Sequence, residues 1–485
     1  MFSGIAFAQT VEFVEPRNVL TAVMPEISTY KVKDITYVMY DYYNKTTLKS
    51  DIQLDAYDAN MKFNGTSLIN HTEDATEPYI FEGIYAMSDK LVLLKSEWDK
   101  KTGNEISIFP VNASAAKQAG TKLCGFPAEK MMNTGIFHVN VSPDGTKLVV
   151  LCELPWVKDS LEHTTVYVYD NNFKQLWTRD YRFPNANGTE KYRYNDVYVN
   201  NAGVVFDMKR VPVHKALDYF TVFTFFNNGA KVEERKMDLG EGGHISTYKS
   251  AFCTNGDLLM AGYCYPDKKV GVNVETPNNA FYVKISAVDG GMPVCKLSAI
   301  APSAAIKAKY LLALADNSAI LVGENEYVTS TLKPGATVGM AGGDSDFDYN
   351  NTNISAMKIG ADGVKKWEHT IGRDMKSRND GGKMLGIYAC MMGDNLVITY
   401  QDFIYRHDGK SHIVAAGFDF MHVDVIRKIN DLGITVSEAY INDKRLAGKD
   451  SEYELLPATG RKLNETTMWF IAGRGLELVS TKVTL

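Results

Sequence analysis

Two neighbouring stretches decide the fold: NVSPDGTKLVV at residues 140–150 and TTVYVYDNNFKQLWTRDYRF at residues 164–183. In TVYVY, residues 165–169, apolar residues recur with a period of two, which is typical of β-strands. Pro143 fixes φ before the tight reversal at Asp144-Gly145, and a second polar turn divides the longer stretch. Together they predict a unit of four antiparallel strands.

This unit recurs along the whole chain, and its first turn returns roughly every 53 to 76 residues. The first turns are expected at Lys33-Asp34, Ser88-Asp89, Asp144-Gly145, Ala202-Gly203, Asn255-Gly256, Asn317-Ser318, Gly393-Asp394 and Asn464-Glu465. A four-stranded sheet cannot bury both of its faces alone, whereas blades packed around an axis can. The pattern therefore predicts an all-β fold, a β-propeller of eight four-stranded antiparallel blades.

The last unit shows only three strands, in YELLPATGRK, TTMWFIAGRG and LELVSTKVTL. The N-terminal TVEFVEPR precedes the first unit, so we expect it to supply the missing fourth strand and to close the ring by pairing the two ends of the chain. A seven-bladed ring with an accessory hairpin is the alternative. Residues 9–485 form one domain in either case, with an insertion loop at about residues 327–352.

The SPDG turn at residues 142–145, followed by Leu148, resembles the turn of WD40-like propellers of the TolB type, which also occurs in propellers of prolyl-oligopeptidase-type peptidases. Trp367 in ADGVKKWEH and Trp177 in DNNFKQLWTRD are similar to the outer-strand tryptophans of quinoprotein-like propellers. That resemblance implies that both side chains pack between blades. Neither resemblance identifies a subfamily.

The N-terminus MFSGIAFAQT contains Ile5-Ala6-Phe7-Ala8, in which small residues occupy both positions of an A-x-A cleavage site. We interpret residues 1–8 as the remnant of a signal peptide and expect an exported protein, either periplasmic or associated with the cell surface or outer membrane. The six cysteines are too sparse for a disulfide framework and lack metal-ligand spacing. Buried thiols on strands are favoured, with one or two bridges as the alternative.

The composition and motifs argue against several classes of function. A net charge of -6 gives no general attraction for nucleic acid. The sequence has no run of 18 or more apolar residues, so it predicts no transmembrane helix. The sequence contains neither H-E-x-x-H nor G-x-S-x-G, so the zinc-protease and serine-hydrolase motifs are missing. We predict no catalytic residues and no organic cofactor, and we favour a protein that is not an enzyme.

The acidic stretch AGGDSDFDYNNTN at residues 341–353 places Asp344, Asp346, Asp348 and Asn350 at alternate positions. Alternate carboxylates resemble the opening of an EF-hand loop, but Tyr349 and Ser355 stand where that motif needs glycine and glutamate. The stretch is interpreted as a solvated acidic insertion, and calcium binding by these four residues is the alternative.

Three functions from different classes fit these observations. The favoured one is a non-catalytic exported platform for a protein partner in a bacterial cell envelope, such as an outer-membrane secretion or assembly complex. The second is a carbohydrate-active or other hydrolytic propeller whose acidic residues meet in the central funnel. The third is a ligand-binding sensor domain. Converging carboxylates in the funnel would favour the enzyme, and an apolar patch on one rim would favour the platform.

Overall fold

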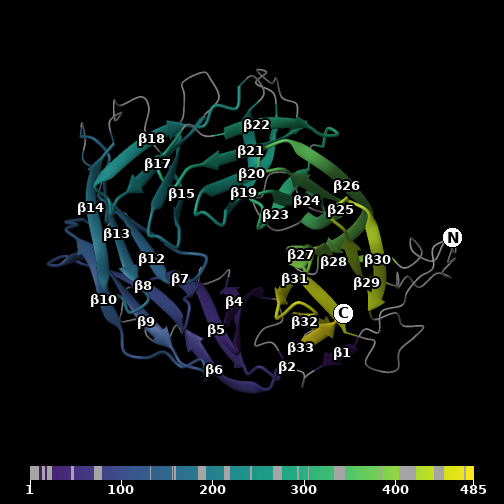
Figure 1. The fold of residues 1–485 in the computed structure, drawn as a ribbon. Coiled ribbons are helices and arrows are strands. Elements are labelled where there is room, and N and C mark those ends of the chain that lie inside the picture. The colour runs from purple at the N-terminus through teal and green to yellow at the C-terminus, as the bar shows by residue number, and fades with distance from the viewer. Residues whose placement is uncertain are drawn as a thin grey trace.

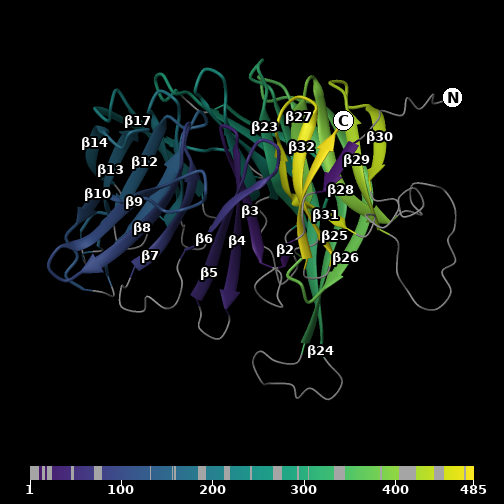
Figure 2. The ribbon, with the colours of Figure 1, turned by 90° about the horizontal axis from the view of Figure 1, so that it is seen from below.

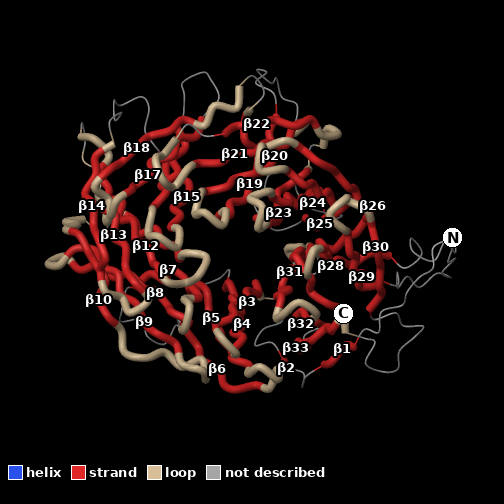
Figure 3. The backbone as a smooth tube through the Cα atoms, in the orientation of Figure 1, coloured by secondary structure: helices blue, strands red, loops and turns tan. Residues whose placement is uncertain are grey.

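Eight antiparallel sheets of four main strands surround a central axis in the computed structural model (Figure 1). Strands and loops account for all of the described residues, and no helix occurs among them (Figure 3). The structure describes residues 10–13, 17–18, 25–44, 49–69, 79–130, 133–155, 157, 160–183, 193–211, 219–240, 243–265, 276–291, 294–303, 305–332, 345–382, 385–403, 422–441, 453–474 and 477–485. The predicted all-β propeller is confirmed.

The first four blades follow one another along the chain. Blade 1 comprises β3 (Glu26–Val32), β4 (Ile35–Asn44), β5 (Lys49–Tyr57) and β6 (Phe63–Ile69). Blade 2 comprises β7 (Tyr79–Ala86), β8 (Leu91–Asp99), β9 (Gly103–Val111) and β10 (Thr121–Phe126). Blade 3 comprises β11 (Ile136–Val141), β12 (Lys147–Glu153), β13 (His163–Asp170) and β14 (Gln175–Arg182). Blade 4 comprises β15 (Arg193–Val199), β16 (Val205–Val211), β17 (Tyr219–Phe226) and β18 (Lys231–Lys236).

The remaining blades continue in the same order. Blade 5 comprises β19 (His244–Phe252), β20 (Leu258–Tyr265), β21 (Asn279–Ile285) and β22 (Val294–Ala299). Blade 6 comprises β23 (Ile306–Ala313), β24 (Ala319–Leu332), β25 (Ser345–Ile359) and β26 (Lys365–Arg378). Blade 7 comprises β27 (Ile387–Met392), β28 (Asn395–Phe403), β29 (His422–Ile429) and β30 (Thr435–Ile441). Blade 8 comprises β31 (Glu454–Lys462), β32 (Thr467–Arg474), β33 (Glu477–Thr484) and β1 (Thr10–Phe13).

The two ends of the chain close the ring inside blade 8. β1 pairs antiparallel with β33, with Val11 opposite Val483, and the short β2 (Arg17–Asn18) pairs farther along the same strand. The predicted closure by TVEFVEPR is confirmed, and the seven-bladed alternative is excluded. Each predicted first turn also lies between the first and second strands of its blade.

Interblade packing explains why the second strands are apolar on both faces. On β12, Leu148 and Val150 pack toward blade 2 in one cluster, and Val149 and Leu151 pack toward blade 4 in another. All four side chains are fully buried. At about 25 cal/mol per Å² of apolar surface, removing both faces of each sheet from water is the main source of stability in this architecture.

The SPDG turn of blade 3 is held by its own side chains. Asp144 Oδ1 accepts hydrogen bonds from Ser142 Oγ at 2.7 Å and from the Thr146 amide at 2.9 Å. Gly145 has φ of 69°, a left-handed conformation that favours glycine. The Gly145 carbonyl accepts the Ser88 amide at 3.0 Å, so the turn also fixes blade 3 against blade 2.

Both outer-strand tryptophans pack between blades, as the resemblance implies. Trp177 is buried in the cluster shared by blades 3 and 4, close to Gly229. Trp367 lies against Gly433 of blade 7 and donates its indole N–H to the Asp431 carbonyl at 2.8 Å. Large side chains on outermost strands therefore fill the wedge-shaped space between neighbouring blades.

The expected insertion loop at residues 327–352 is corrected by the structure. Most of it is strand: β24 continues to Leu332, and β25 begins at Ser345. The two strands pair from Ala319 opposite Ile359 to Leu332 opposite Ser345. Tyr327, Val328 and several threonines favour an extended backbone, and pairing with β25 satisfies those amides and carbonyls of residues 327–332 that point toward β25. The insertion is thus a lengthened β-hairpin.

A truncation tests the ring closure. We expect removal of residues 1–18 to lower the melting temperature and promote aggregation, because β33 loses β1 and β2 and becomes a bare sheet edge. Removal of residues 1–9 alone leaves both strands in place and serves as the control. Equal melting temperatures for the two shortened chains, measured by calorimetry, would contradict this role of β1.

Candidate functional site

The two rims of the ring carry different kinds of connection. Within each blade, the first and third strands end in short turns at one rim, which we call the turn rim; the reversal at residues 142–146 is an example. The opposite rim, the loop rim, carries the connections between second and third strands and between blades. The longest of these join Tyr265 to Asn279, Leu332 to Ser345, Phe403 to His422, and Ile441 to Glu454. Long connections on a rigid scaffold are where binding residues concentrate.

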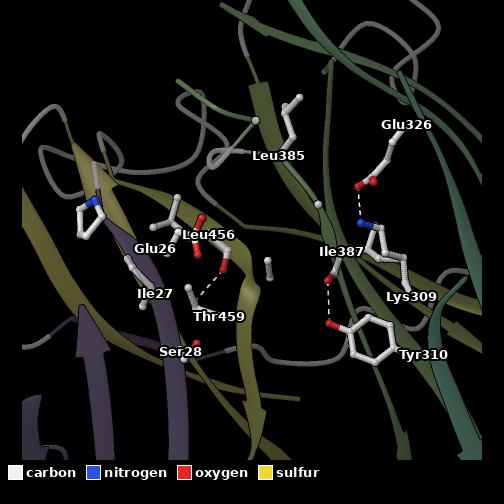
Figure 4. A pocket seen from close by; sticks show the side chains of 14 residues that line it. Glu26, Ile27, Ser28, Lys309, Tyr310, Glu326, Leu385, Ile387, Leu456 and Thr459 are labelled. Carbon is white, nitrogen blue, oxygen red and sulfur yellow. Dashed lines mark hydrogen bonds and ion pairs between the residues drawn. The ribbon is translucent and has the colours of Figure 1, made fainter. Parts of the chain in front are cut away.

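A cavity of about 500 Å³ opens at the loop rim, where the first strands of blades 6, 7, 8 and 1 approach one another (Figure 4). Tyr310 of β23 lines it and donates its hydroxyl to the Ile387 carbonyl at 2.9 Å, which bridges blades 6 and 7. Burial raises the pKa of Tyr310, so this hydroxyl stays protonated. Thr459 of β31 lines the blade 8 side and donates to the Leu456 carbonyl at 2.7 Å.

The acidic groups of blade 6 near this cavity are compensated by nearby cations. Lys309 pairs with Glu326 across the cavity wall, as Figure 4 shows, and Lys307 Nζ lies 3.7 Å from the same carboxylate. Glu324 and Arg373 form a fully buried ion pair, and Arg373 Nε donates to the Gln401 carbonyl at 2.7 Å. Burial raises the pKa of Glu324, while Arg373 and Lys309 oppose that rise.

The two blade 6 glutamates beside this cavity differ from the carboxyl pair of a glycosidase. A glycosidase needs one protonated carboxyl and one unpaired carboxylate facing the same substrate bond. Here Glu326 is neutralised by lysine and Glu324 is buried against arginine. Among the described residues, no group of three histidine, cysteine, aspartate or glutamate side chains could hold a metal ion.

A second hollow of about 280 Å³ lies beside the first and shares Glu326 and Gly382 with it. Its wall includes Lys307 at the start of β23 and Val328 and Tyr349 on the lengthened hairpin. The two hollows therefore extend from the first strands of blades 6, 7, 8 and 1 to the base of the hairpin. We call the region of the first hollow the channel mouth.

The lengthened hairpin projects beyond the loop rim, with the end of β24 at its far point (Figure 2). Side chains alternate between its two faces. One face carries Val328 and Phe347, which are 55% and 45% exposed, and Tyr349, which reaches the second hollow. Tyr327, on the other face, is 46% exposed. Large apolar side chains exposed next to a hollow are typical of an interaction surface.

The polar face of the hairpin contains most of the acidic residues proposed to bind calcium. Asp346, Asp348 and Asn350 share this face of β25, whereas Asp344 lies outside the described residues. Asp348 is bound by Arg378 Nε and by Lys376 Nζ, each at 2.7 Å, and these bonds lower its pKa.

Asp346 and Asn350 are also held by hydrogen bonds to neighbouring residues. Asp346 accepts the Asn379 side-chain amide at 2.9 Å, and Asn350 donates its own side-chain amide to the Asp348 carbonyl at 3.0 Å. The structure therefore brings three of the four residues together on a strand face that already contains two cations. Calcium binding remains a prediction.

A calcium titration separates the two interpretations of this face. Because Arg378 and Lys376 already compensate Asp348, we expect millimolar calcium to leave the melting temperature unchanged. A calcium-dependent rise that Asp346→Asn abolishes, with magnesium as the control ion, would instead support the calcium site.

A second charged cluster lies between blades 3 and 4, away from the hairpin. Lys209 of β16 is fully buried, with its Nζ 2.8 Å from Glu162 Oε1 and 3.8 Å from Asp207 Oδ2. The same ammonium lies 4.8 Å from the centre of the Phe183 ring, a cation–π contact. Neither carboxylate oxygen of Asp207 has a hydrogen-bond partner among the described residues. Burial raises the pKa of Asp207 to about 7, although Lys209 opposes the rise.

Substitutions at this cluster test whether Lys209 is its essential member. Lys209→Met leaves the Asp207 and Glu162 carboxylates without their cation, and we expect a loss of about 3–5 kcal/mol in the free energy of unfolding. Asp207→Asn should be nearly neutral or stabilising at pH 8, because Glu162 still pairs with Lys209.

The pH dependence gives a second readout for Asp207. Its folded-state pKa exceeds the ordinary carboxyl value of about 4, so its contribution to stability falls as the pH rises from about 4 to about 7. We expect Asp207→Asn to remove this slope in urea-unfolding series. Equal slopes in both proteins, or a mild effect of Lys209→Met, would contradict this description of the cluster.

The hairpin surface was not anticipated from the sequence. Val328 and Phe347 were assigned to an irregular loop, although the alternation in EYVTSTL and SDFDYNN was a strand signal. The ion pair of Lys309 with Glu326 carried no local signal, because it depends on the register of β23 against β24, which is irregular between Ala308 and Tyr310.

Comparisons with known proteins extend no further than the architecture. No family model and no curated protein matches the chain. Among solved structures, the chain is similar to the β-propeller domain of the Trilobed protease from Pyrococcus furiosus, with 11% identity, 74% of this chain and 97% of that chain covered, and a TM-score of 0.34. A Pyrococcus horikoshii acylaminoacyl peptidase shows 9% identity, 78% and 58% coverage, and a TM-score of 0.35.

The WD40 domain of SCAP from fission yeast shows 7% identity over 97% of this chain and 98% of that chain, with a TM-score of 0.36. These identities and scores are too low to carry an inference about activity or partner. The described residues include no helix that is long and apolar enough to cross a membrane. The chain is an eight-bladed β-propeller, and no narrower family is assigned to it.

Proposed function

We propose that the chain is a non-catalytic platform that binds a protein partner, and that the lengthened hairpin of blade 6 is its main contact element. The projecting hairpin carries this proposal, since Val328, Phe347 and Tyr327 are exposed on it beside two connected hollows. The ion pairs of Glu326 with Lys309 and of Glu324 with Arg373 add support, because neither glutamate is the unpaired carboxylate that hydrolysis of a glycoside needs.

The open edge of β24 suggests how the partner binds. β23 pairs with β24 only as far as Ile306 opposite Asn325, whereas β24 continues to Leu332. In the described part of the chain, no strand pairs with residues 327–332 on the side where β23 pairs with the earlier part of β24. An exposed strand edge can accept an extended peptide as an additional strand.

The direction of the free backbone groups follows from one hydrogen bond. The Glu326 amide donates to the Ala305 carbonyl at 2.9 Å, so the amide and carbonyl of Glu326 point toward the side of β23. Backbone groups alternate along a strand, and therefore those of Val328 and Ser330 point to the open edge. Those of Thr329 point to β25, where Asp348 is its partner.

We further propose that the partner is a cell-envelope protein and that this chain is exported. The A-x-A pattern at Ile5–Ala8 supports export, although residues 1–9 lie outside the described part of the chain. A role as an accessory subunit of an outer-membrane secretion or assembly complex, or a TolB-like periplasmic role, rests on analogy of fold and compartment.

A ligand-binding role is the second candidate, and the channel-mouth cavity is the observation that favours it. Its volume of about 500 Å³ lies in the range of small-molecule sites, and it combines apolar and polar lining residues. In that case Tyr310 and Lys309 would contact the ligand from β23. Small-molecule binding that survives disruption of the hairpin would favour this candidate.

Two adjacent proline substitutions test the platform. The partner is first captured from envelope membranes with the wild-type chain, and its affinity is then measured with purified proteins. Ser330→Pro removes an amide that points to the open edge of β24 and has no partner strand there, so we expect a nearly unchanged melting temperature. The partner loses that amide as a hydrogen-bond donor, so we expect at least tenfold weaker binding. Thr329→Pro removes a bond to β25 and should cost about 1–3 kcal/mol of stability.

Matched controls decide the outcome. Leu432 and Ile434 of blade 7 are also exposed, at 73% and 57%, so the double variant Leu432→Ser/Ile434→Ser should bind the partner normally. Loss of binding in that variant, with full binding by Ser330→Pro, would place the contact on blade 7. A monomeric chain that recruits no membrane partner and cleaves glycan or peptide libraries would overturn the platform itself.

A further inference from the structure

Two buried cysteines from different blades meet in the interface between blades 2 and 3. Cys124 lies on β10, Cys152 lies on β12, and their sulfur atoms are 3.7 Å apart. All six cysteines of the chain are described and all are free thiols. This is the one sulfur–sulfur contact recorded among them.

The backbone next to Cys124 is already fixed to blade 3. The Leu123 carbonyl accepts the hydroxyl of Tyr169 from β13 at 3.0 Å, one residue before Cys124. The two sulfur atoms are therefore held together by a neighbouring interblade bond in addition to apolar packing. Such positioning raises the effective concentration of one thiol at the other, which favours a bond between them.

Local geometry also gives a route for oxidation. β10 is the outermost strand of blade 2, and its pairing with β9 is irregular between Lys122 and Cys124. An outermost strand that contains a bulge opens at a lower free-energy cost than the inner strands of its sheet. Cys124 is 6% exposed and Cys152 is fully buried, so opening of β10 exposes Cys124 first.

We propose that Cys124 and Cys152 are an oxidation site, and that reaction with a small-molecule disulfide converts them into an interblade disulfide. The Cys124 sulfur attacks the reagent disulfide RS–SR, forms a mixed disulfide and releases RSH. The Cys152 sulfur then attacks the Cys124 sulfur, forms the protein disulfide and releases a second RSH. Both thiol protons leave on the two RSH molecules, and the reagent receives the two electrons.

The order of the two attacks agrees with the environment of each thiol. Burial and the nearby Cys124 sulfur raise the pKa of Cys152, which makes its thiolate scarce and disfavours it as the first nucleophile. Closure then occurs when β10 returns to its place and brings the mixed disulfide against Cys152.

The bond would join positions 28 residues apart in the sequence and fix blade 2 to blade 3 covalently. It stabilises the folded ring by restricting the unfolded chain, and reductants reverse it. This site is independent of the proposed platform, because it lies in blades 2 and 3 and the partner-binding hairpin lies in blade 6.

The test uses the purified full chain in redox buffers. Native protein is equilibrated with oxidised glutathione or with a reducing agent, quenched with acid, and alkylated in denaturant. We expect six alkylated cysteines after reduction and four after oxidation, with one linked peptide pair that contains Cys124 and Cys152. The melting temperature should rise on oxidation and return on reduction.

Two single variants provide the controls. Cys124→Ser should lose the oxidation-dependent rise in melting temperature, whereas Cys295→Ser, at a cysteine without a recorded sulfur neighbour, should keep it. If Cys124→Ser fails to fold, peptide mapping of the wild-type chain alone decides. Six alkylated thiols after oxidation, a different linked pair, or glutathione retained on Cys124 would overturn the proposal.

Discussion

The antiparallel pairing of β1 with β33 is the contact on which the rest of the structure depends. Each blade buries its two faces against its neighbours, so the burial of every sheet requires a complete ring. The chain closes that ring by supplying the outermost strand of blade 8 from its other end. Because the termini close the ring through strand pairing, the other interfaces need only side-chain packing and a few hydrogen bonds, such as the one from the Ser88 amide to the Gly145 carbonyl.

Much of this architecture was predictable because it repeats. Alternation with a period of two and a polar reversal in every unit favoured eight blades over seven. The shortfall of one strand in the last unit indicated the role of the N-terminal segment, and the structure confirms both. The hairpin of blade 6 was predicted as a loop because aspartate and asparagine, which are frequent in residues 344–353, are disfavoured in strands, and pairing of β24 with β25 overrides that preference.

Contacts across blade interfaces were not predictable from the sequence. Tyr310 of blade 6 and Ile387 of blade 7 lie 77 positions apart, and Lys209 of blade 4 and Glu162 of blade 3 lie 47 positions apart. Each pair forms because two sheets face one another at a particular height along the axis, and a single sequence contains no record of that height. The contact between Cys124 and Cys152 has the same origin, which is why their spacing in the sequence gave no indication of it.

The interfaces between blades combine apolar packing with a few buried charges, and each such charge depends on a partner across the sheet or interface. Lys209 and Arg373 are both fully buried, so removing either partner would leave an ion in an apolar environment. This dependence makes the alignment of neighbouring blades specific. It also leaves Glu324 and Glu326, the two glutamates of blade 6 beside the cavity, paired with cations.

The lengthened hairpin shows that one blade of this fold can become longer without any change in the contacts that close the ring. β24 and β25 extend past the end of β23 along their own axis, and the packing of blade 6 against blades 5 and 7 involves the parts of these strands inside the ring. Residues added in pairs at the tip preserve the register below them and leave all eight interfaces unchanged. The hairpin of blade 6 can therefore become longer or shorter, and its exposed surface larger or smaller, without any adjustment elsewhere in the chain.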